Sequence, residues 1–282
     1  MIDEGKIISR HEFKRDNAWL TISAITLLLF LIFLILISSL TDSIFPIPSV
    51  LSILFVIIIA ISLSMIVYFH VNNNRKFTYF LYERGVRIFD HDSGNVFFTP
   101  FNKIQYIHKY QTGINPNGKI NTMAFRTSKN KHWNIIVNNI NNAYPLINTI
   151  IHHQIIHIGI ISLNNLSLGQ CVVFDLIKNN NYWLNFPILS DLLNLMKLRW
   201  LQMDTVPLSL SAHTLVTIDR IICIEDIFRI EIAREKRHDK IRLFDKDGNI
   251  LFSLDYSALI NADLFIALIE HMIQNRIPAY YE

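Results

Sequence analysis

Three histidines lie close together in the segment "IHHQIIH", where two of them could share a metal ion. His153 and His157 are four residues apart, so a helix would place both on one face. A zincin-type site requires the sequence His-Glu-x-x-His, in which the glutamate is the general base. Gln154 stands in place of that glutamate, and no third ligand lies nearby. We therefore interpret these histidines as structural or surface residues and predict no metal site.

The acidic residues offer little catalytic chemistry. The segment "DKDGN" resembles a calcium-binding loop, but Gly248 comes too early and Leu254 stands where an EF-hand has glutamate, so we predict a hairpin turn. Glu225 and Asp226 are neighbours in a strand-rich region, where adjacent side chains point to opposite faces. The chain has no P-loop, Gly-x-Gly-x-x-Gly or Gly-x-Ser-x-Gly motif and only eight glycines. We predict a non-enzymatic protein without a cofactor.

A basic segment, "RIEIAREKRHDKIR", is the first candidate binding surface. Its candidate lipid- or partner-binding residues are Arg229, Arg234, Lys236, Arg237, Lys240 and Arg242. Each could contribute about 1 kcal/mol of attraction to an anionic membrane leaflet. Alternatively, the segment is a solvated hairpin whose charges are balanced by acidic neighbours. Nucleic acid is not an expected partner, because no aromatic stacking platform accompanies the basic residues and the net charge is only +3.

Two apolar runs predict that the chain is anchored in a membrane. The composition is 51% hydrophobic, which is high for an ordinary soluble protein. Residues 18–40 and 50–70 contain no Asp, Glu, Lys or Arg, and each run reaches the roughly 20 residues that a membrane span needs. We predict a transmembrane helical hairpin over residues 18–71. Ala60 and Ser64 form a small-xxx-small pair that could pack against another helix in the membrane.

The flanking charges predict the orientation of this hairpin. Four Lys or Arg residues precede the first run and four follow the second closely, whereas the loop 41–49 has none. Positive residues stay on the cytoplasmic side of a membrane. Both termini are therefore expected in the cytoplasm, with the short loop 41–49 outside. The heavy use of Asn and Ile fits AT-rich coding, and we expect a bacterial inner-membrane protein.

From Phe77 onward, strand-like segments rich in aromatic and β-branched residues alternate with turn signals. A helical spacing then begins near Ala143, with Asn141 or Asn142 available as its N-cap. The segment "IRLFDKDGNILFSLDYSALINADLFIALIEH" repeats the order of "AFRTSKNKHWNIIVNNINNAYPLINTIIHHQ": a strand, a polar turn, a strand and a capped helix, here with Asn261 as the expected cap. We interpret this order as an internal duplication.

Several strands closed by one helix, directly after a two-helix hairpin, resemble the bacterial pleckstrin-homology-like membrane proteins of the YcxB-like kind. The resemblance is architectural and covers residues 18–154 best. It implies an α+β cytoplasmic region of two PH-like, partly open β-barrels, each closed by a C-terminal helix. Such folds usually bind lipid head groups, peptides or protein surfaces.

The predicted organisation therefore has four parts. They are a cytoplasmic segment (1–17), the hairpin (18–71), a first PH-like domain (74–160) and a second one (161–282). The second domain contains an inserted helix (188–203), whose apolar surface is wider than one stripe. The helix is either wedged between the two β domains or docks against the bilayer or a partner protein. The candidate partner-binding residues are Leu192, Leu193, Met196 and Trp200.

We expect a non-enzymatic inner-membrane protein whose cytoplasmic domains bind a protein partner. That partner would be a toxin, which would make the chain an immunity protein, or an envelope protein. The alternatives are a lipid-sensing or envelope-stress regulator that binds anionic head groups, and an accessory subunit of a transporter. Cys171 and Cys223 lie far apart with no Cys-x-x-Cys spacing, and we expect two buried free thiols.

Overall fold

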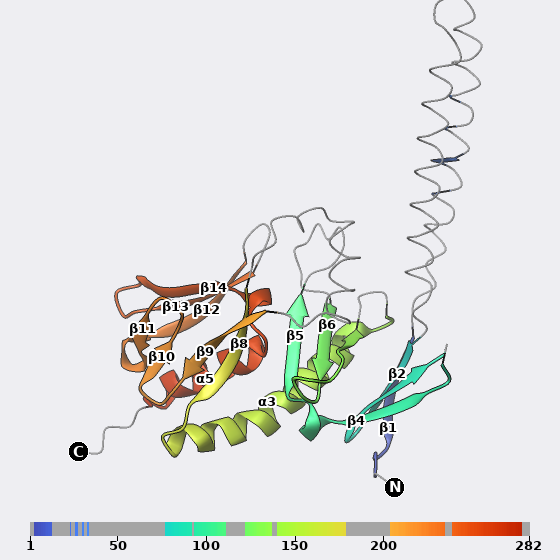
Figure 1. Ribbon diagram of the computed structural model, residues 1–282, viewed down its shortest axis with the longest axis horizontal. Helices are drawn as coiled ribbons and strands as arrows, with labels where there is room; N and C mark the ends of the chain where they lie inside the picture. The colour runs from blue at the N-terminus through green and yellow to red at the C-terminus, as the bar shows by residue number, and fades with distance from the viewer. Residues whose placement is uncertain are drawn as a thin grey trace, which may run out of the picture. The chain divides into compact units, whose positions relative to one another are not determined.

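The computed structural model describes residues 3–12, 77–91, 93–110, 122–136, 140–178, 204–234 and 239–277, with five helical positions between 23 and 33 (Figure 1). By its internal contacts the chain divides into two units. One contains residues 1–12, 78–89 and 96–282, and the other contains residues 13–77 and 90–95. In the smaller unit, the described turn after Phe89 is closed by the Asp90 N–H, which donates to the Asn95 carbonyl at 2.9 Å. The larger unit carries the fold.

The first half of the larger unit contains two antiparallel sheets. One has the order β1 (Ile7–His11), β2 (Phe77–Tyr82), β3 (Gly85–Asp90) and β4 (Val96–Pro100). After the 3-10 turn η1 (Phe101–Lys103), the strands β5 (Tyr106–Tyr110), β6 (Thr122–Arg126) and β7 (Asn134–Ile136) form the other. The helix α3 (Ala143–Ser167) follows.

The second half repeats this order of elements. Its four-stranded antiparallel sheet contains β8 (Val172–Ile177), β9 (Thr205–Leu210), β10 (Thr214–Val216) and β11 (Ile221–Cys223). The 3-10 turn η3 (Ile224–Asp226) leads to β12 (Arg229–Arg234), β13 (Asp239–Phe244) and β14 (Ile250–Asp255). A short turn η4 (Tyr256–Ala258) and the helix α5 (Ala262–Gln274) complete the half. The predicted repetition of element order is confirmed.

The repetition extends to the buried side chains. Strand register relates His11–Tyr79 in the first half to Phe174–Leu208 in the second, and Val86–Thr99 to Leu215–Ile222. All of these positions are buried. Further equivalent buried pairs are Leu81 and Leu210, Phe101 and Ile224, Ile104 and Ile227, Met123 and Ile241, Phe125 and Leu243, Leu146 and Phe265, and Ile150 and Ile269. Period-two alternation in the strands and helical spacing after them thus build two similar cores.

Both helices begin after an asparagine in the left-handed conformation. Asn142 has φ 52° and Asn261 has φ 62°, and neither makes a side-chain cap hydrogen bond. Asn adopts this conformation more readily than most other residues because its short polar side chain can bond locally. The two helices therefore begin after the asparagines that the sequence predicts as N-caps, but neither asparagine uses its side chain for the cap.

The helix α3 extends through both halves of the larger unit. Leu146 and Ile150 are buried in the first half, and its distal residue Leu166 belongs to the core of the second half. α3 packs against η1, α5 and β8 (Figure 1). Among the described residues it is the one helix long and apolar enough to cross a membrane by length and composition. Its packing assigns it to the folded core.

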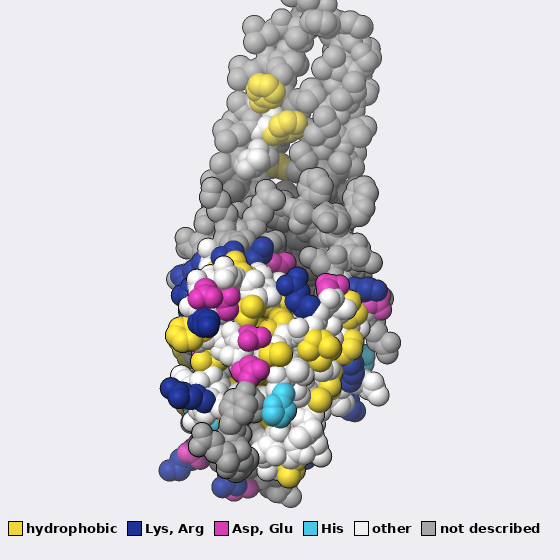
Figure 2. Space-filling view, turned by 90° about the vertical axis from the view of Figure 1, so that its left-hand side faces the viewer, with side chains coloured by type: hydrophobic (Ala, Val, Ile, Leu, Met, Phe, Trp, Pro, Cys, Tyr) yellow, Lys and Arg dark blue, Asp and Glu magenta, His cyan; other side chains and the backbone are white. Residues whose placement is uncertain are grey.

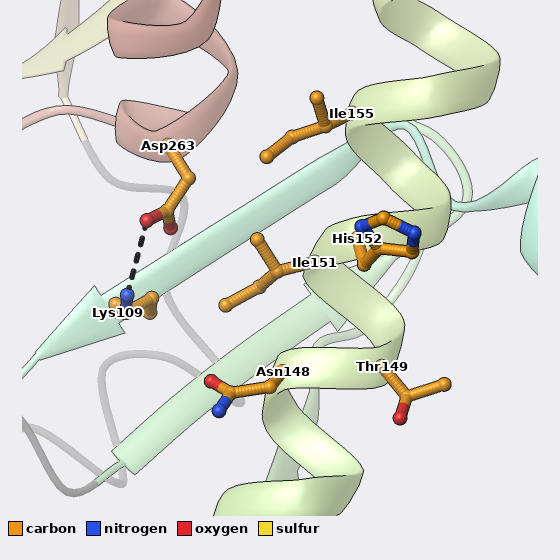
Figure 3. A pocket seen from close by; sticks show the side chains of 7 residues that line it. All are labelled: Lys109, Asn148, Thr149, Ile151, His152, Ile155 and Asp263. Carbon is orange, nitrogen blue, oxygen red and sulfur yellow. Dashed lines mark hydrogen bonds and ion pairs between the residues drawn. The ribbon is translucent and has the colours of Figure 1, made fainter.

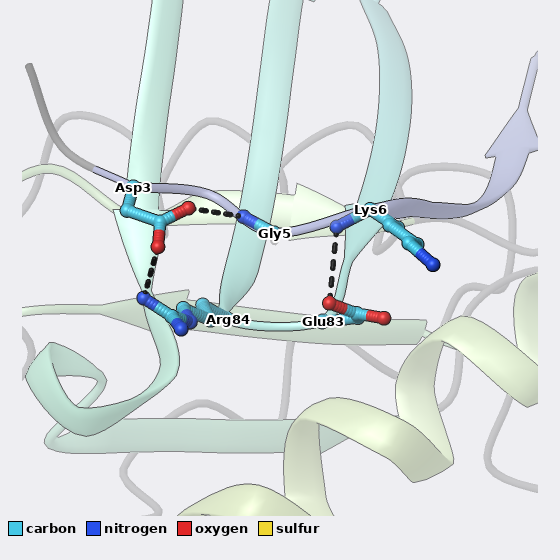
Figure 4. A network of polar contacts seen from close by, with 5 residues as sticks. All are labelled: Asp3, Gly5, Lys6, Glu83 and Arg84. Carbon is cyan, nitrogen blue, oxygen red and sulfur yellow. Dashed lines mark hydrogen bonds and ion pairs between the residues drawn. The ribbon is translucent and has the colours of Figure 1, made fainter.

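The N-terminal segment is fastened to the turn between β2 and β3 (Figure 4). The Asp3 carboxylate accepts the Gly5 N–H at 3.1 Å and pairs with Arg84 at 2.5 Å. Glu83 accepts the Lys6 N–H at 3.1 Å. The chain thus leaves β1 at residue 12 and re-enters the same sheet in β2, directly beside it.

The fold class predicted from the sequence is wrong. In place of an N-terminal two-helix hairpin followed by two partly open barrels, the described elements are four small antiparallel sheets and two helices. None of the described sheets closes into a barrel. A break after the fourth strand of each half separates its two sheets: Pro100 cannot donate to a strand ladder, and η1 and η3 then turn the chain. Apart from the five helical positions, the predicted spans 18–40 and 50–70 lie outside the described residues.

Candidate functional site

The edge strand β5 of the first half is covered by the loop that precedes α5. Asn261 donates its backbone N–H to the Ile107 carbonyl at 2.7 Å, and its side-chain oxygen accepts the Ile107 N–H at 2.6 Å. Its side-chain nitrogen donates to the Gln105 carbonyl at 2.9 Å. Asn261 therefore serves as a short additional strand on β5, which explains why its side chain does not cap α5.

Gln154, from the middle of α3, locks this contact. Its Nε2 donates to the Gln105 carbonyl at 3.1 Å and to Asn261 Oδ1 at 2.9 Å, and the residue is 1% exposed. A buried amide needs such partners, because an unpaired one costs about 1–3 kcal/mol. The sequence signal was a glutamine among apolar helix positions, and we missed its role.

An ion pair flanks the covered edge. Lys109 Nζ of β5 lies 3.2 Å from Asp263 Oδ1, in the first turn of α5, and 4.9 Å from the centre of the Tyr256 ring (Figure 3). Both charged side chains are about one-fifth exposed. Figure 3 shows Ile151, His152 and Ile155 of α3 beside this pair. These residues line a hollow of about 520 Å³, in which the lysine and aspartate charges already neutralise each other.

His108 contributes a buried contact to the same junction. Its Nε2 donates to the Ser257 carbonyl at 2.7 Å. Burial lowers the pKa of His108 to about 4, and the contact with Ser257 opposes this shift only in part. The imidazole is therefore neutral in the folded protein at ordinary pH, and it serves as a neutral hydrogen-bond donor.

The histidines of α3 do not converge on a common point. The His153 ring stacks on Phe101 with 4.0 Å between ring centres, and His157 stacks on His153 at 6.1 Å. Burial and the neighbouring histidines lower the pKa of His153. His152 points to the hollow instead. Within the described ranges, no three His, Cys, Asp or Glu side chains are grouped for a metal.

The edge strand β12 of the second half occupies the place that β5 has in the first. Ile230 pairs with Leu243 as Ile107 pairs with Phe125, so its N–H and C=O also point away from the sheet. No contact of the described residues covers them. Phe228, directly before the strand, is 62% exposed, and Ile232 within it is 48% exposed. A strand edge with free backbone groups and apolar side chains is suited to pairing with another chain.

The predicted basic residues are split between the faces of the β12–β13 hairpin. Lys236 and Arg237 lie outside the described residues. Arg229 pairs with Glu231 and lies 4.3 Å from the centre of the Phe244 ring; Arg242 is directly opposite Glu231, and Lys240 is two residues before it in β13. By strand alternation Arg234 belongs to the other face, opposite Asp239. Figure 2 shows basic side chains interspersed with acidic and apolar ones on this side of the molecule.

Among the described residues, the remaining candidates form no site with those above. Glu225 and Asp226 lie in η3, not in a strand. Cys171 and Cys223 are free, as predicted, but both are exposed, so their expected burial is wrong. "DKDGN" is a turn in which the Asp245 carboxylate accepts the N–H groups of Asp247 and Asn249. Leu192, Leu193, Met196 and Trp200 lie outside the described residues, as do Ala60 and Ser64.

No protein-family model matches the chain, and no curated protein matches it in sequence. The resemblance to YcxB-like proteins stays a prediction. The features that bear on function are the covered β5 edge and the β12 edge, which no described residue covers.

Proposed function

We propose that this chain is a non-enzymatic, membrane-anchored protein that binds a protein partner along the β12 edge. The observation that carries the proposal is the unequal state of two equivalent edges. The β5 edge is covered by Asn261, whereas no described residue covers the β12 edge, where Phe228, directly before the strand, and Ile232 are exposed. Pairing a strand edge with a partner's backbone supplies affinity, and neighbouring side chains supply specificity.

In this proposal, the apolar runs 18–40 and 50–70 anchor the chain in the inner membrane of a bacterium. His11 of β1 pairs with Tyr79 of β2, so the chain leaves and re-enters one sheet at neighbouring positions. The described residues on either side of the stretch between these two residues therefore lie on the same side of any membrane that the chain enters. This supports the topology that the flanking Lys and Arg residues predict, with the β-rich part in the cytoplasm.

The local balance of charge favours a protein partner over a lipid surface. Arg229 is paired with Glu231, and Arg234 stands opposite Asp239, so these two arginines present little unbalanced positive charge. Attraction to anionic lipids needs such an excess. An immunity protein that neutralises a toxin is one specific form of this function, and binding of an envelope protein is another.

Photocross-linking in intact membranes tests the proposal. A photoreactive residue at Ile232 of the full chain should give an adduct with a protein. The matched control is Ile160, which is 65% exposed on α3 and lies away from β12 in the sequence of elements. A protein adduct at Ile232 and none at Ile160 is the expected result. Adducts with lipid alone at Ile232 would overturn the proposal.

A further inference from the structure

The two halves present complementary free ends. Asn142, the counterpart of Asn261, is exposed, and so is Tyr144 two residues later, whereas Asn261 is used inside the chain. The open β12 edge is the counterpart of the β5 edge that Asn261 covers. We propose that a second copy of this chain docks its Asn142 loop on the β12 edge, head to tail. This inference rests on the proposed function and names the partner that the edge takes.

The backbone of the β12 edge offers what the Asn142 loop needs. Within the chain, Asn261 gives one N–H and one amide nitrogen to β5 and accepts one N–H from it. Asn142 is the same residue type in the same left-handed conformation before a helix, so it presents the same three groups. Ile230 stands where Ile107 stands and Phe228 where Gln105 stands, so the three hydrogen bonds that Asn261 makes have counterparts. The two bonds of Gln154 have none, because Ile273 stands at its position in the second half.

The side chains that flank the asparagine differ between the internal junction and the free ends, and both members of the pair differ together. The internal junction pairs Lys109 with Asp263. At the free ends, Ile232 replaces the lysine and Tyr144 replaces the aspartate, with 48% and 54% exposed. An ion pair inside the chain thus corresponds to an apolar pair between chains. This exchange discriminates between partners, because Ile232 against a carboxylate would desolvate that charge without compensation.

The contact is heterologous, because a loop of one copy meets a strand of the next. Such a contact either closes into a ring or continues as a chain of copies. Each copy keeps one free β12 edge and one free Asn142 loop until the assembly closes. The second copy supplies both the left-handed asparagine and the apolar residue two positions after it, which is the combination that the edge accepts.

A transplant of the internal ion pair tests the inference. In the full chain in detergent, Ile232→Lys alone and Tyr144→Asp alone should each weaken self-association about tenfold, because each leaves a charge against an apolar partner. The double variant should return to within about threefold of the wild type, since the two changes are coupled. Sedimentation over a range of concentrations measures the association, and thermal unfolding confirms that each variant is folded. The control is Ile160→Lys, which should leave association unchanged.

Disulfide trapping identifies the two contacting positions. With Cys171 and Cys223 replaced by alanine, a chain carrying Ile232→Cys is mixed with a chain carrying Tyr144→Cys. A cross-linked dimer is expected from this mixture, and none from the mixture of Ile232→Cys with Ile160→Cys. A double Ile232→Lys, Tyr144→Asp variant that is weaker than both single variants would overturn the inference, as would the absence of the dimer.

The outcomes also separate this inference from the proposed function. If a photoadduct at Ile232 contains a different protein and the disulfide dimer is absent, the second copy is wrong and the binding edge stands. If Ile232 forms no protein adduct at all, both are wrong. If the adduct contains the same chain and the disulfide dimer forms, both are supported.

Discussion

The two halves of the β-rich unit use the same order of elements for different ends. In the first half, β5 is an edge only in its own sheet, because Asn261 and Gln154 complete its hydrogen bonding. In the second half, β12 is the edge strand of its sheet, and no described residue covers that edge. Conversely, Asn261 makes three hydrogen bonds with backbone groups of Ile107 and Gln105, whereas Asn142 is exposed. The same edge strand, and the same asparagine before a helix, can thus be used inside the chain in one half and left at the surface in the other.

The largest losses of stability should come from substitutions in the two cores, and they should be similar because the cores are equivalent. Leu146→Ala and Phe265→Ala remove fully buried side chains at the same helical position. Each should lower the free energy of unfolding by about 3–5 kcal/mol, from lost apolar burial and the cavity left behind. Denaturant unfolding of the full chain in detergent measures both. A mild effect at Leu146 beside a severe one at Phe265 would break the comparison.

Acid should weaken the junction through His108, whose position in the second half is occupied by Glu231 instead of a histidine. Because its pKa is about 4 when folded and about 6.5 when unfolded, the unfolded chain binds the proton first as the pH falls. Stability is therefore lost between about pH 6.5 and 4, by about 3 kcal/mol for this group, and retained above that range.

The control for this prediction is His108→Gln, which should flatten that part of the profile while other groups continue to titrate. The difference between the two unfolding profiles isolates His108 from His153, whose pKa is lowered as well. Parallel profiles for the wild type and the variant would contradict the role assigned to His108.

The two left-handed asparagines should respond differently to glycine. Glycine adopts this conformation without strain, so the substitution removes only the side chain. Asn261→Gly loses the side-chain hydrogen bonds with the Ile107 N–H and the Gln105 carbonyl, keeps the backbone bond to Ile107, and should cost about 2–3 kcal/mol. Asn142→Gly should change stability by less than about 0.5 kcal/mol. Thermal unfolding of dilute protein distinguishes them, and equal costs would show that the two loops are not used differently.

The smallest effect should come from the ion pair. Lys109→Ala should lower stability by about 0.5–1 kcal/mol, and less in high salt, because the pair with Asp263 is partly exposed. Ile232→Ala, at the equivalent position of β12, should leave the stability of the single chain nearly unchanged. A salt-independent loss at Lys109 would point to its stem and its contact with Tyr256 instead of its charge.

Local patterns allowed the helix starts, the Asp-Gly turn and the repeated order of elements to be predicted from the sequence. The strand register relates Met123 to Ile241, an alignment that the order of elements alone does not give. A slip of one residue exchanges the two faces of a strand, so the pattern alone could not align the halves. The division into four sheets was missed because it depends on the turns η1 and η3.

The junction could be predicted only in fragments. Gln154 was noticed because it replaced a catalytic glutamate, and its partners Gln105 and Asn261 are far away in the sequence. Asn261 was expected to cap its own helix, which is the usual local use of that side chain. Its contact with β5 arises from tertiary packing, on which a single sequence pattern carries no information.

The distance in sequence between β5 and the residue that covers it also sets how long the β5 edge stays uncovered during synthesis. Ile107 and Asn261 are 154 residues apart, so at about 5–20 residues per second the ribosome needs about 8–30 s to deliver the second after the first. During that interval the edge of β5 is as open as that of β12 in the finished protein. Neighbouring nascent chains on one polysome would then compete with the chain's own C-terminal half, and slower elongation over the second half would favour premature pairing.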